Sequence, residues 1–259
     1  MAKKQEGEKK GKVGQSIFTT KKQRMFSSIV ASHTRYFAKQ SSDPYYHFDI
    51  YAGPGRARYG EGSPLLFFRH RKPGLTYRSY FVENNNKNAF ALRLELEKIN
   101  DPNIKLYNIR CESFLKLLVA GIHQHIRGLI YADPNGILPI EELKMFAEVE
   151  KAFNVDLLMK IDMKSYKRGD LPTGVTNRDY HMNSLKSIIG ELNRKYWFVS
   201  IPVKEPDNYS MLLLATNCLY KPPRFFIPIN DNAATFWISR TVNFYSHITD
   251  GVIKGLLQG

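Results

Sequence analysis

The chain has 259 residues, enough for one large α/β domain with its own hydrophobic core and no need of disulfide bonds. Lys and Arg number 38 against 24 Asp and Glu, a net charge of +14, and the two cysteines are too few for a disulfide framework or a zinc site of paired cysteines. We find no signal-peptide pattern and no apolar run long enough to span a membrane, so we expect a cytoplasmic protein.

The positive charge is distributed along the chain. Residues 1–24 contribute a net +6, which leaves +8 for the remainder. Basic residues are interleaved with aromatic ones, as in residues 67–72 and 166–168, and this pattern favours a polyanionic partner such as DNA or RNA. A charge excess that only increases solubility is the alternative.

The first 40 residues divide into two parts. Residues 1–20 have few apolar side chains and no periodicity, which predicts a disordered basic arm. In residues 21–40 apolar side chains recur at steps of three and four, which predicts an amphipathic helix whose apolar face packs on a sheet. That face consists of Met25, Phe26, Ile29, Val30, His33, Tyr36 and Phe37.

A strand predicted over residues 45–51 runs into a glycine loop. Gly53 and Gly55 let the backbone turn tightly and approach a ligand that a Cβ atom would exclude, so a nucleotide-like ligand is expected. The spacing matches neither the dinucleotide-binding loop nor the P-loop. Ser63 and Pro64 then predict the N-cap and first position of a short helix.

The second predicted strand ends in an acidic residue, and an acidic residue follows shortly after the third. A strand over residues 76–83 ends at Glu83, where nucleoside-binding α/β folds place a carboxylate for the ribose hydroxyls; an exposed Glu without a role is the alternative. A helix over residues 87–99 and a third strand over residues 104–109 follow. Cys111 and Glu112 then open a helix that extends to Leu118.

A fourth strand, beginning at Gly128, delivers Asp133-Pro134-Asn135-Gly136 into a turn, and a helix is predicted over residues 139–153. The Asp133 carboxylate and the Pro134 carbonyl can accept the two N–H groups of an exocyclic amine and so localise its lone pair. A simple β-turn is the alternative. His123 and His125 lack a nearby third ligand, so no metal site is expected.

The remaining elements complete an α/β pattern. A fifth strand over residues 155–161 leads into a loop of about 20 residues, which is either solvated or functional. A helix over residues 183–192 and two antiparallel strands over residues 197–202 and 210–216 follow. The candidates in the loop for phosphate contact and base stacking are Lys164, Tyr166, Lys167 and Arg168.

Two motifs resemble those of a known superfamily. Phe48–Gly55, followed by Gly62-Ser63-Pro64, resembles motif I of the S-adenosylmethionine-dependent methyltransferases that act on nucleic acids, and more closely the three-Cys-motif partner family, with Tyr51 in place of Phe. Asp133-Pro134 resembles motif IV of the amino-directed enzymes, although Asn135-Gly136 replaces their Pro-aromatic pair.

The resemblance covers residues 21–217 and leaves residues 218–259 as a C-terminal extension. It implies a Rossmann-like methyltransferase fold, with a mostly parallel seven-stranded sheet in the order 3-2-1-4-5-7-6 and an antiparallel final strand. S-adenosylmethionine is the implied cofactor. The residues implied to bind it are Asp49, Tyr51, Ala52, Gly53, Gly55, Glu83, Cys111 and Glu112.

The implied reaction is methyl transfer to an exocyclic amine of DNA or RNA, with adenine N6 as the first choice and Asp133, Pro134 and Asn135 at the acceptor. Arg56 and Arg58 are expected to join the later basic loop in contacting the nucleic acid. A cysteine-rich partner protein is implied for relatives. The alternative is an inactive scaffold of the same fold that binds nucleic acid or protein, because a fold does not determine a function.

Overall fold

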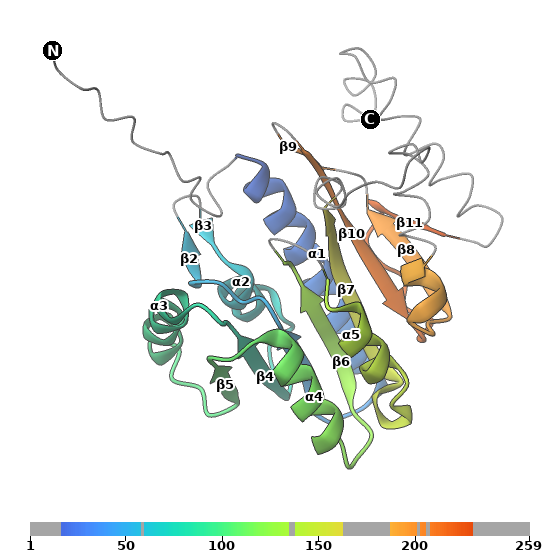
Figure 1. The fold of residues 1–259 in the computed structure, drawn as a ribbon, viewed down its shortest axis with the longest axis horizontal. Coiled ribbons are helices and arrows are strands. Elements are labelled where there is room, and N and C mark those ends of the chain that lie inside the picture. The colour runs from blue at the N-terminus through green and yellow to red at the C-terminus, as the bar shows by residue number, and fades with distance from the viewer. Residues whose placement is uncertain are drawn as a thin grey trace, which may run out of the picture.

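The structure, a computed structural model, describes residues 17–57, 60–134, 138–162, 187–200, 203–205 and 208–229. Within these residues a nine-stranded sheet has helices on both faces, which confirms the predicted α/β class (Figure 1). The labelled α-helices are α1 Ile17–Gln40, α2 Ser63–His70, α3 Asn86–Glu97, α4 Cys111–Gly121 and α5 Ile140–Ala147, and residues 187–191 are also helical. The strands of this sheet are β1 Tyr45–Asp49, β4 Tyr77–Val82, β5 Ile104–Tyr107, β6 Arg127–Ala132, β7 Asn154–Asp162, β8 Tyr196–Ser200, β9 Val203–Glu205, β10 Asn208–Thr216 and β11 Phe226–Pro228. A separate two-stranded ribbon is formed by β2 Arg56–Ala57 and β3 Gly60–Glu61.

The strand order confirms the predicted topology. The sheet runs β11-β8-β10-β7-β6-β1-β4-β5, and numbering the seven predicted strands along the chain turns its central part into 3-2-1-4-5-7-6. Strands β5, β4, β1, β6 and β7 pair in parallel, whereas β10 is antiparallel to both β7 and β8. The described sheet is larger than predicted, because β9 pairs with β10, and β11, from the expected C-terminal extension, pairs with β8.

Three local predictions need correction. The first helix begins at Ile17, so residues 17–20 are helical and not part of a disordered arm. The helix expected over residues 139–153 ends at Ala147 and is followed by a separate 3-10 turn, Glu150–Ala152. Gly62, not Ser63, is the N-cap of α2, since Ser63 is already the first residue of the helix.

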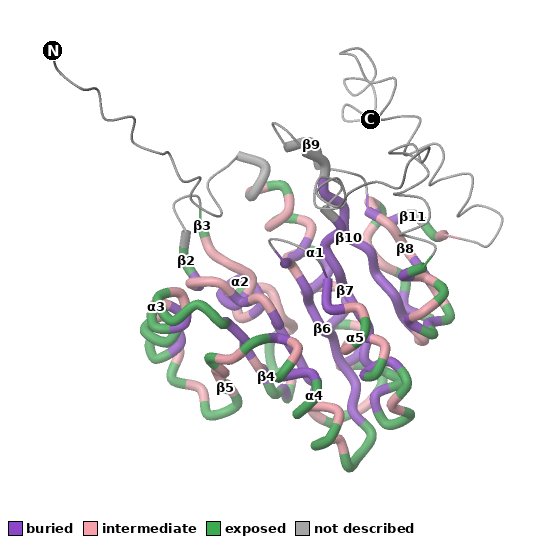
Figure 2. The backbone as a smooth tube through the Cα atoms, in the orientation of Figure 1, coloured by how far each residue is buried: buried purple, intermediate pink, exposed green. Residues whose placement is uncertain are grey.

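The sheet is buried between two helical layers (Figure 2). Alternation along β1 sends Tyr46 and Phe48 into the core under α4 and α5, while Tyr45 packs under α1 and α2. The predicted apolar face of α1 is confirmed as core. Its fully or nearly buried members are Phe26, Ile29, Val30, His33 and Phe37.

Polar contacts also hold α1 against the sheet. His33 is fully buried, with Nε2 2.9 Å from Asp156 Oδ2 and Nδ1 2.8 Å from the Tyr45 hydroxyl. At the far end of the helix, the Arg127 guanidinium donates to the carbonyl of Phe37 at 2.9 Å and to two carbonyls beyond the helix. Because these hydrogen bonds are formed away from water, breaking them is costly, and they fix the position of α1 along the sheet.

Candidate functional site

The glycine loop follows β1 at the carboxyl end of the central strand. Gly53 and Gly55 have φ values of +65° and +76°, which favour glycine. A Cβ atom on Gly55 would lie 2.9 Å from Leu92 Cδ1, so Gly55 is needed for packing on α3. A Cβ atom on Gly53 would meet nothing within 4 Å. Gly53 is therefore the glycine that borders open space.

Backbone hydrogen bonds hold this loop between the two neighbouring strands. The Ile50 N–H donates to the Tyr131 carbonyl of β6 at 3.0 Å, and the Ala52 N–H donates to the Val82 carbonyl of β4 at 2.9 Å. Since β1, β4 and β6 are parallel, their carboxyl ends meet at one edge of the sheet. The glycine loop, Glu83 and Asp133 therefore lie at the same edge.

Glu83 fixes the loop directly. Its Oε2 accepts a hydrogen bond from the Gly53 N–H at 2.9 Å, and its Oε1 accepts one from the Asn85 N–H at 2.7 Å. The residue is only 9% exposed. A carboxylate has about four acceptor positions, so both oxygens can accept a further hydrogen bond, such as one from a ribose hydroxyl.

Asp49 lies at the base of the loop and is fully buried. Its Oδ1 accepts a 3.3 Å hydrogen bond from the Tyr51 N–H, while Oδ2 has no hydrogen-bond partner among the described residues. Burial raises the pKa of Asp49 to about 7; bonds from Ser63 and Tyr51 oppose this rise, and the charges of Asp133 and Glu83 add to it. The three carboxyl groups therefore form one electrostatic cluster.

Stability is expected to depend on the ionisation of Asp49. Because its folded pKa is about 7 and its unfolded pKa about 3.8, the folded state loses stability as pH rises from about 4 to about 7. An Asp49→Asn variant has no carboxyl proton to lose at this position. The free energy of unfolding in urea, taken as the variant minus the natural protein, should therefore be higher at pH 8 than at pH 4. A difference that does not change with pH would contradict this expectation.

Asp133 directly follows β6 and is held by three side chains. Its Oδ2 lies 2.5 Å from Lys22 Nζ of α1 and accepts a 3.1 Å hydrogen bond from the Tyr131 hydroxyl. Its Oδ1 lies 3.3 Å from Lys160 Nζ of β7. Burial alone would raise the pKa of Asp133, but Lys22 and Lys160 outweigh it and hold that pKa well below its usual range.

The contacts of Asp133 determine its chemistry. With three of about four acceptor positions occupied by described residues, one position on Oδ1 remains for a further donor. A carboxylate with so low a pKa stays ionised and is a weak base. It can orient an N–H group without removing its proton.

Tyr51, Cys111 and Glu112 lie on the α4 side of the loop. The Cys111 thiol donates to the Tyr51 hydroxyl at 3.0 Å, and burial raises the pKa of Cys111 to about 11, so the thiol stays protonated. Glu112 forms an exposed ion pair with Arg110 at 3.4 Å. The Ala52 side chain is buried in the core beside Phe81, which leaves only its backbone at the loop.

The predicted nucleic-acid contacts are only partly described. Arg56 is exposed, but its Nε donates to Glu95 at 2.8 Å and its Nη2 lies 3.6 Å from Glu61, so its charge is already paired. The remaining candidates, and one acceptor residue, lie outside the described residues: Arg58, Asn135, Lys164, Tyr166, Lys167 and Arg168.

Sequence reasoning missed Lys22 and Lys160. Two signals were present. Lys22 is one helical turn before Phe26, on the face of α1 that was predicted to be buried, and Lys160 interrupts the apolar strand β7. A lysine on a buried face requires an anionic partner, because an unpaired buried charge is costly. Asp133 is that partner.

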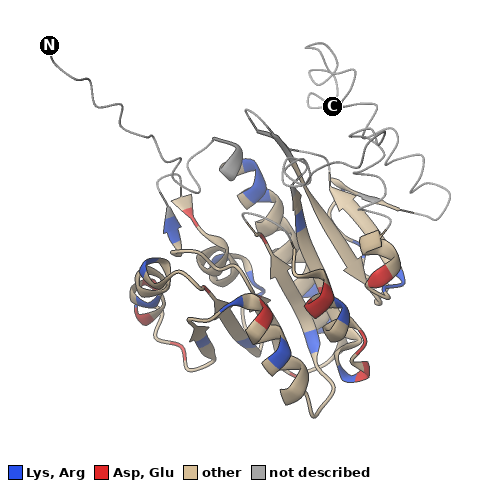
Figure 3. Ribbon diagram, viewed as in Figure 1, with Lys and Arg blue, Asp and Glu red and all other residues tan. Residues whose placement is uncertain are grey.

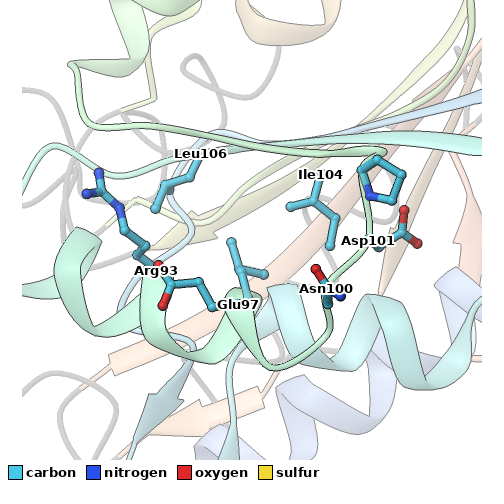
Figure 4. Close-up of a pocket in the computed structure, with 8 residues that line it drawn as sticks. Arg93, Glu97, Asn100, Asp101, Ile104 and Leu106 are labelled. Atoms are coloured by element: carbon cyan, nitrogen blue, oxygen red, sulfur yellow. The ribbon is translucent and has the colours of Figure 1, made fainter.

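A shallow surface hollow of about 320 Å³ lies elsewhere, between α3 and the edge strand β5 (Figure 4). Arg93, Asn100 and Ile104 are among its lining residues, and none of the predicted site residues lines it. Ile104 is the first residue of β5, whereas the candidate site lies at the carboxyl ends of the parallel strands.

The described residues contain neither a cluster of metal ligands nor a helix that could span a membrane. No group of three or more His, Cys, Asp or Glu side chains in the described ranges is arranged to hold a metal ion. None of the described helices combines the length and apolar character needed to cross a membrane.

Comparison with known proteins gives similar structures but no family. No family model matches the sequence, and no curated protein matches it. A Legionella pneumophila protein is similar over 85% of this chain and 91% of its own, with 13% identity and a TM-score of 0.49. An rRNA methylase from Streptococcus thermophilus is similar over 76% and 93%, with 10% identity and a TM-score of 0.46. TYW2 from M. jannaschii, solved with AdoMet, is similar over 79% and 77%, with 12% identity and a TM-score of 0.45.

Proposed function

We propose that this protein is an S-adenosylmethionine-dependent methyltransferase that methylates an exocyclic amine of a nucleic acid, with adenine N6 as the first choice. One observation carries the proposal: Gly53, Glu83 and Asp133 meet at the carboxyl ends of three neighbouring parallel strands. Ligands of open α/β sheets bind at this edge.

The chemistry of the loop suits the cofactor. Bound S-adenosylmethionine supplies an electrophilic methyl group on a cationic sulfur. In a chain with a net charge of +14, Asp49, Glu83 and Asp133 place three carboxyl groups at the edge of the sheet that carries the glycine loop. Glu83 has acceptor capacity left for ribose hydroxyls, and ionised Asp49 favours a cationic ligand.

Asp133 supports the choice of an amine as the acceptor. An exocyclic amine is a weak nucleophile because its lone pair is delocalised into the ring. The free position on Asp133 Oδ1 and the Pro134 carbonyl would accept its two N–H groups and localise that lone pair. Asp133 remains ionised, so it orients the nitrogen, and the proton released after transfer passes to water or another base.

A second candidate function is a nucleic-acid-binding scaffold without turnover. Lys22 and Lys160 favour it, because they occupy positions on Asp133 that an incoming amine would use. In the enzymatic account Lys22 keeps Asp133 ionised. In the scaffold account Lys22 occupies the Asp133 carboxylate, so that an incoming amine cannot bind there.

Methyl incorporation separates the two functions. The full chain is incubated with methyl-labelled S-adenosylmethionine and unmodified RNA or DNA, and the nucleic acid is digested to nucleosides for mass spectrometry. The enzyme predicts labelled N6-methyladenosine. Nucleic-acid binding without labelled nucleoside supports the scaffold and contradicts the proposed reaction.

A further inference from the structure

The outer face of α1 has an unusual charge composition. The helix Ile17–Gln40 contains five Lys or Arg residues and no Asp or Glu. Of these five, only Lys22 turns toward the candidate site. The other four are exposed and lie on the face opposite the core: Lys21, Arg24, Arg35 and Lys39.

These four residues, which we call the α1 stripe, have no charge partner among the residues that the structure describes. None of them forms a hydrogen bond or ion pair with a described residue, in contrast to Arg56 and Arg69, whose charges are paired with Glu61. An exposed helix in a protein commonly gains stability from pairs of opposite charge. The α1 stripe has no such pairs, so its like charges repel one another unless an external anion lies along them.

The position of α1 connects the stripe to the candidate site. The first turns of the helix reach the site, since Lys22 binds Asp133 and the Gln23 amide donates to the Glu61 carbonyl at 2.7 Å. The other end lies near Arg127, at the opposite edge of the sheet. From Lys21 to Lys39 the stripe extends about 27 Å at 1.5 Å per residue. In Figure 3 the helix that carries it passes behind the sheet, with Lys and Arg visible on its upper turns.

The length and shape of the stripe favour a linear polyanion. Phosphates of one nucleic-acid strand repeat regularly along a backbone, and about 27 Å corresponds to roughly eight base-pair steps of a duplex. A membrane surface fits less well, because membrane-bound amphipathic helices insert an apolar face. The apolar face of α1 is buried in the core, and from residue 20 to residue 40, where the burial of the side chains is described, the helix carries no large exposed hydrophobic residue.

We propose that the α1 stripe is the docking surface for the phosphodiester backbone of the nucleic acid, so that a strand lying on α1 presents a nucleotide to Asp133 at the N-terminal end of the helix. This inference deepens the proposed function by naming the surface that holds the substrate. Binding of nucleic acid to the α1 stripe requires no methyl transfer. The docking surface and the proposed enzymatic function can therefore be contradicted independently of each other.

The test compares two variants of the full chain with equal loss of charge. In the stripe variant Lys21, Arg24, Arg35 and Lys39 become Gln, which keeps good helix propensity. In the control variant four exposed cations, two on α3, one on β5 and one directly before β8, become Gln: Lys87, Arg93, Lys105 and Lys195. Binding of labelled RNA and DNA oligonucleotides is measured by fluorescence anisotropy from about 50 to 300 mM salt, and thermal melting confirms that each variant is folded.

We expect the stripe variant to bind at least tenfold more weakly than the control variant. The slope of log K against log salt should fall in magnitude by about 3, because each lost phosphate contact removes about 0.7 to 0.9. The double variant R24K/R35K keeps the charge and should bind like the natural protein. Equal losses in the stripe and control variants, or binding to anionic vesicles in place of nucleic acid, would overturn the inference.

Methyl incorporation, measured on the same samples, separates this inference from the proposed function. Binding that depends on the stripe but produces no methylated nucleoside supports the docking surface and contradicts the enzyme. Methylation that persists, with unchanged affinity, in the stripe variant supports the enzyme and contradicts the docking surface.

Discussion

Replacing Asp133 with alanine is expected to lower the rate of methyl transfer by about 10²- to 10³-fold, the usual cost of losing one preorganised polar group at a reaction centre. The alanine removes the acceptor that orients the amine, while the glycine loop and Glu83 remain in place. Cofactor affinity is also expected to fall, because the variant loses one carboxylate of the cluster and leaves Lys22 and Lys160 unpaired beside a cationic ligand, so the rate is compared at saturating cofactor. Single-turnover kinetics with saturating cofactor measures this effect.

Asparagine at position 133 is the matched control. Both Asp133→Ala and Asp133→Asn lose the negative charge that pairs with Lys22 and Lys160, but only Asn keeps an oxygen that can accept the N–H group. The Asn variant should therefore retain clearly more activity than the Ala variant. Equal rates of methyl transfer in the two variants would show that activity depends on the ion pairs with Lys22 and Lys160 and not on the acceptor oxygen. That result would contradict the proposed role of Asp133.

Replacing Gly53 with valine is expected to weaken binding of S-adenosylhomocysteine by at least about 100-fold. The substitution places a branched side chain in the open space beside the loop and strains a backbone at φ +65°. It also disturbs the N–H group that donates to Glu83. Isothermal titration calorimetry measures the change.

Gly74→Val separates ligand contact from backbone strain. Gly74 has φ +72° and, like Gly53, open space around its Cβ position, but it precedes β4 at the edge of the sheet opposite the candidate site. Both substitutions should lower the free energy of unfolding by a similar amount, about 1–2 kcal/mol, because each places a valine in a left-handed backbone conformation. Only Gly53→Val should lose the ligand. Equal affinities in the two variants would contradict a ligand at Gly53.

The sheet was predictable because local signals agreed with the tertiary arrangement. Apolar runs such as β7, separated by helices with a period of 3.6, require parallel pairing, and the antiparallel β10 followed from the short connection to the strand before it. β11 was not predictable, because it has only three residues, the last of which is Pro228, and its pairing with β8 depends on tertiary contact.

The site was predictable in position but not in its contacts. Gly53, Glu83 and Asp133 each end a predicted strand or begin the turn after one, so their meeting at one edge follows from parallel pairing. Lys22 is 111 residues from Asp133 in sequence, and its contact depends on where α1 crosses the sheet. Ser63 likewise lies inside α2 and does not cap it, although serine is a preferred N-cap residue, because the helix begins one residue earlier than the capping pattern predicts.

The most direct test of a shared site is a crystal structure of the full chain with S-adenosylhomocysteine. The account predicts the adenosine beside Gly53, the ribose hydroxyls on the Glu83 carboxylate, and the sulfur facing Asp133. A ligand bound elsewhere, for example in the hollow between α3 and β5, or an edge that stays empty at saturating ligand, would contradict it.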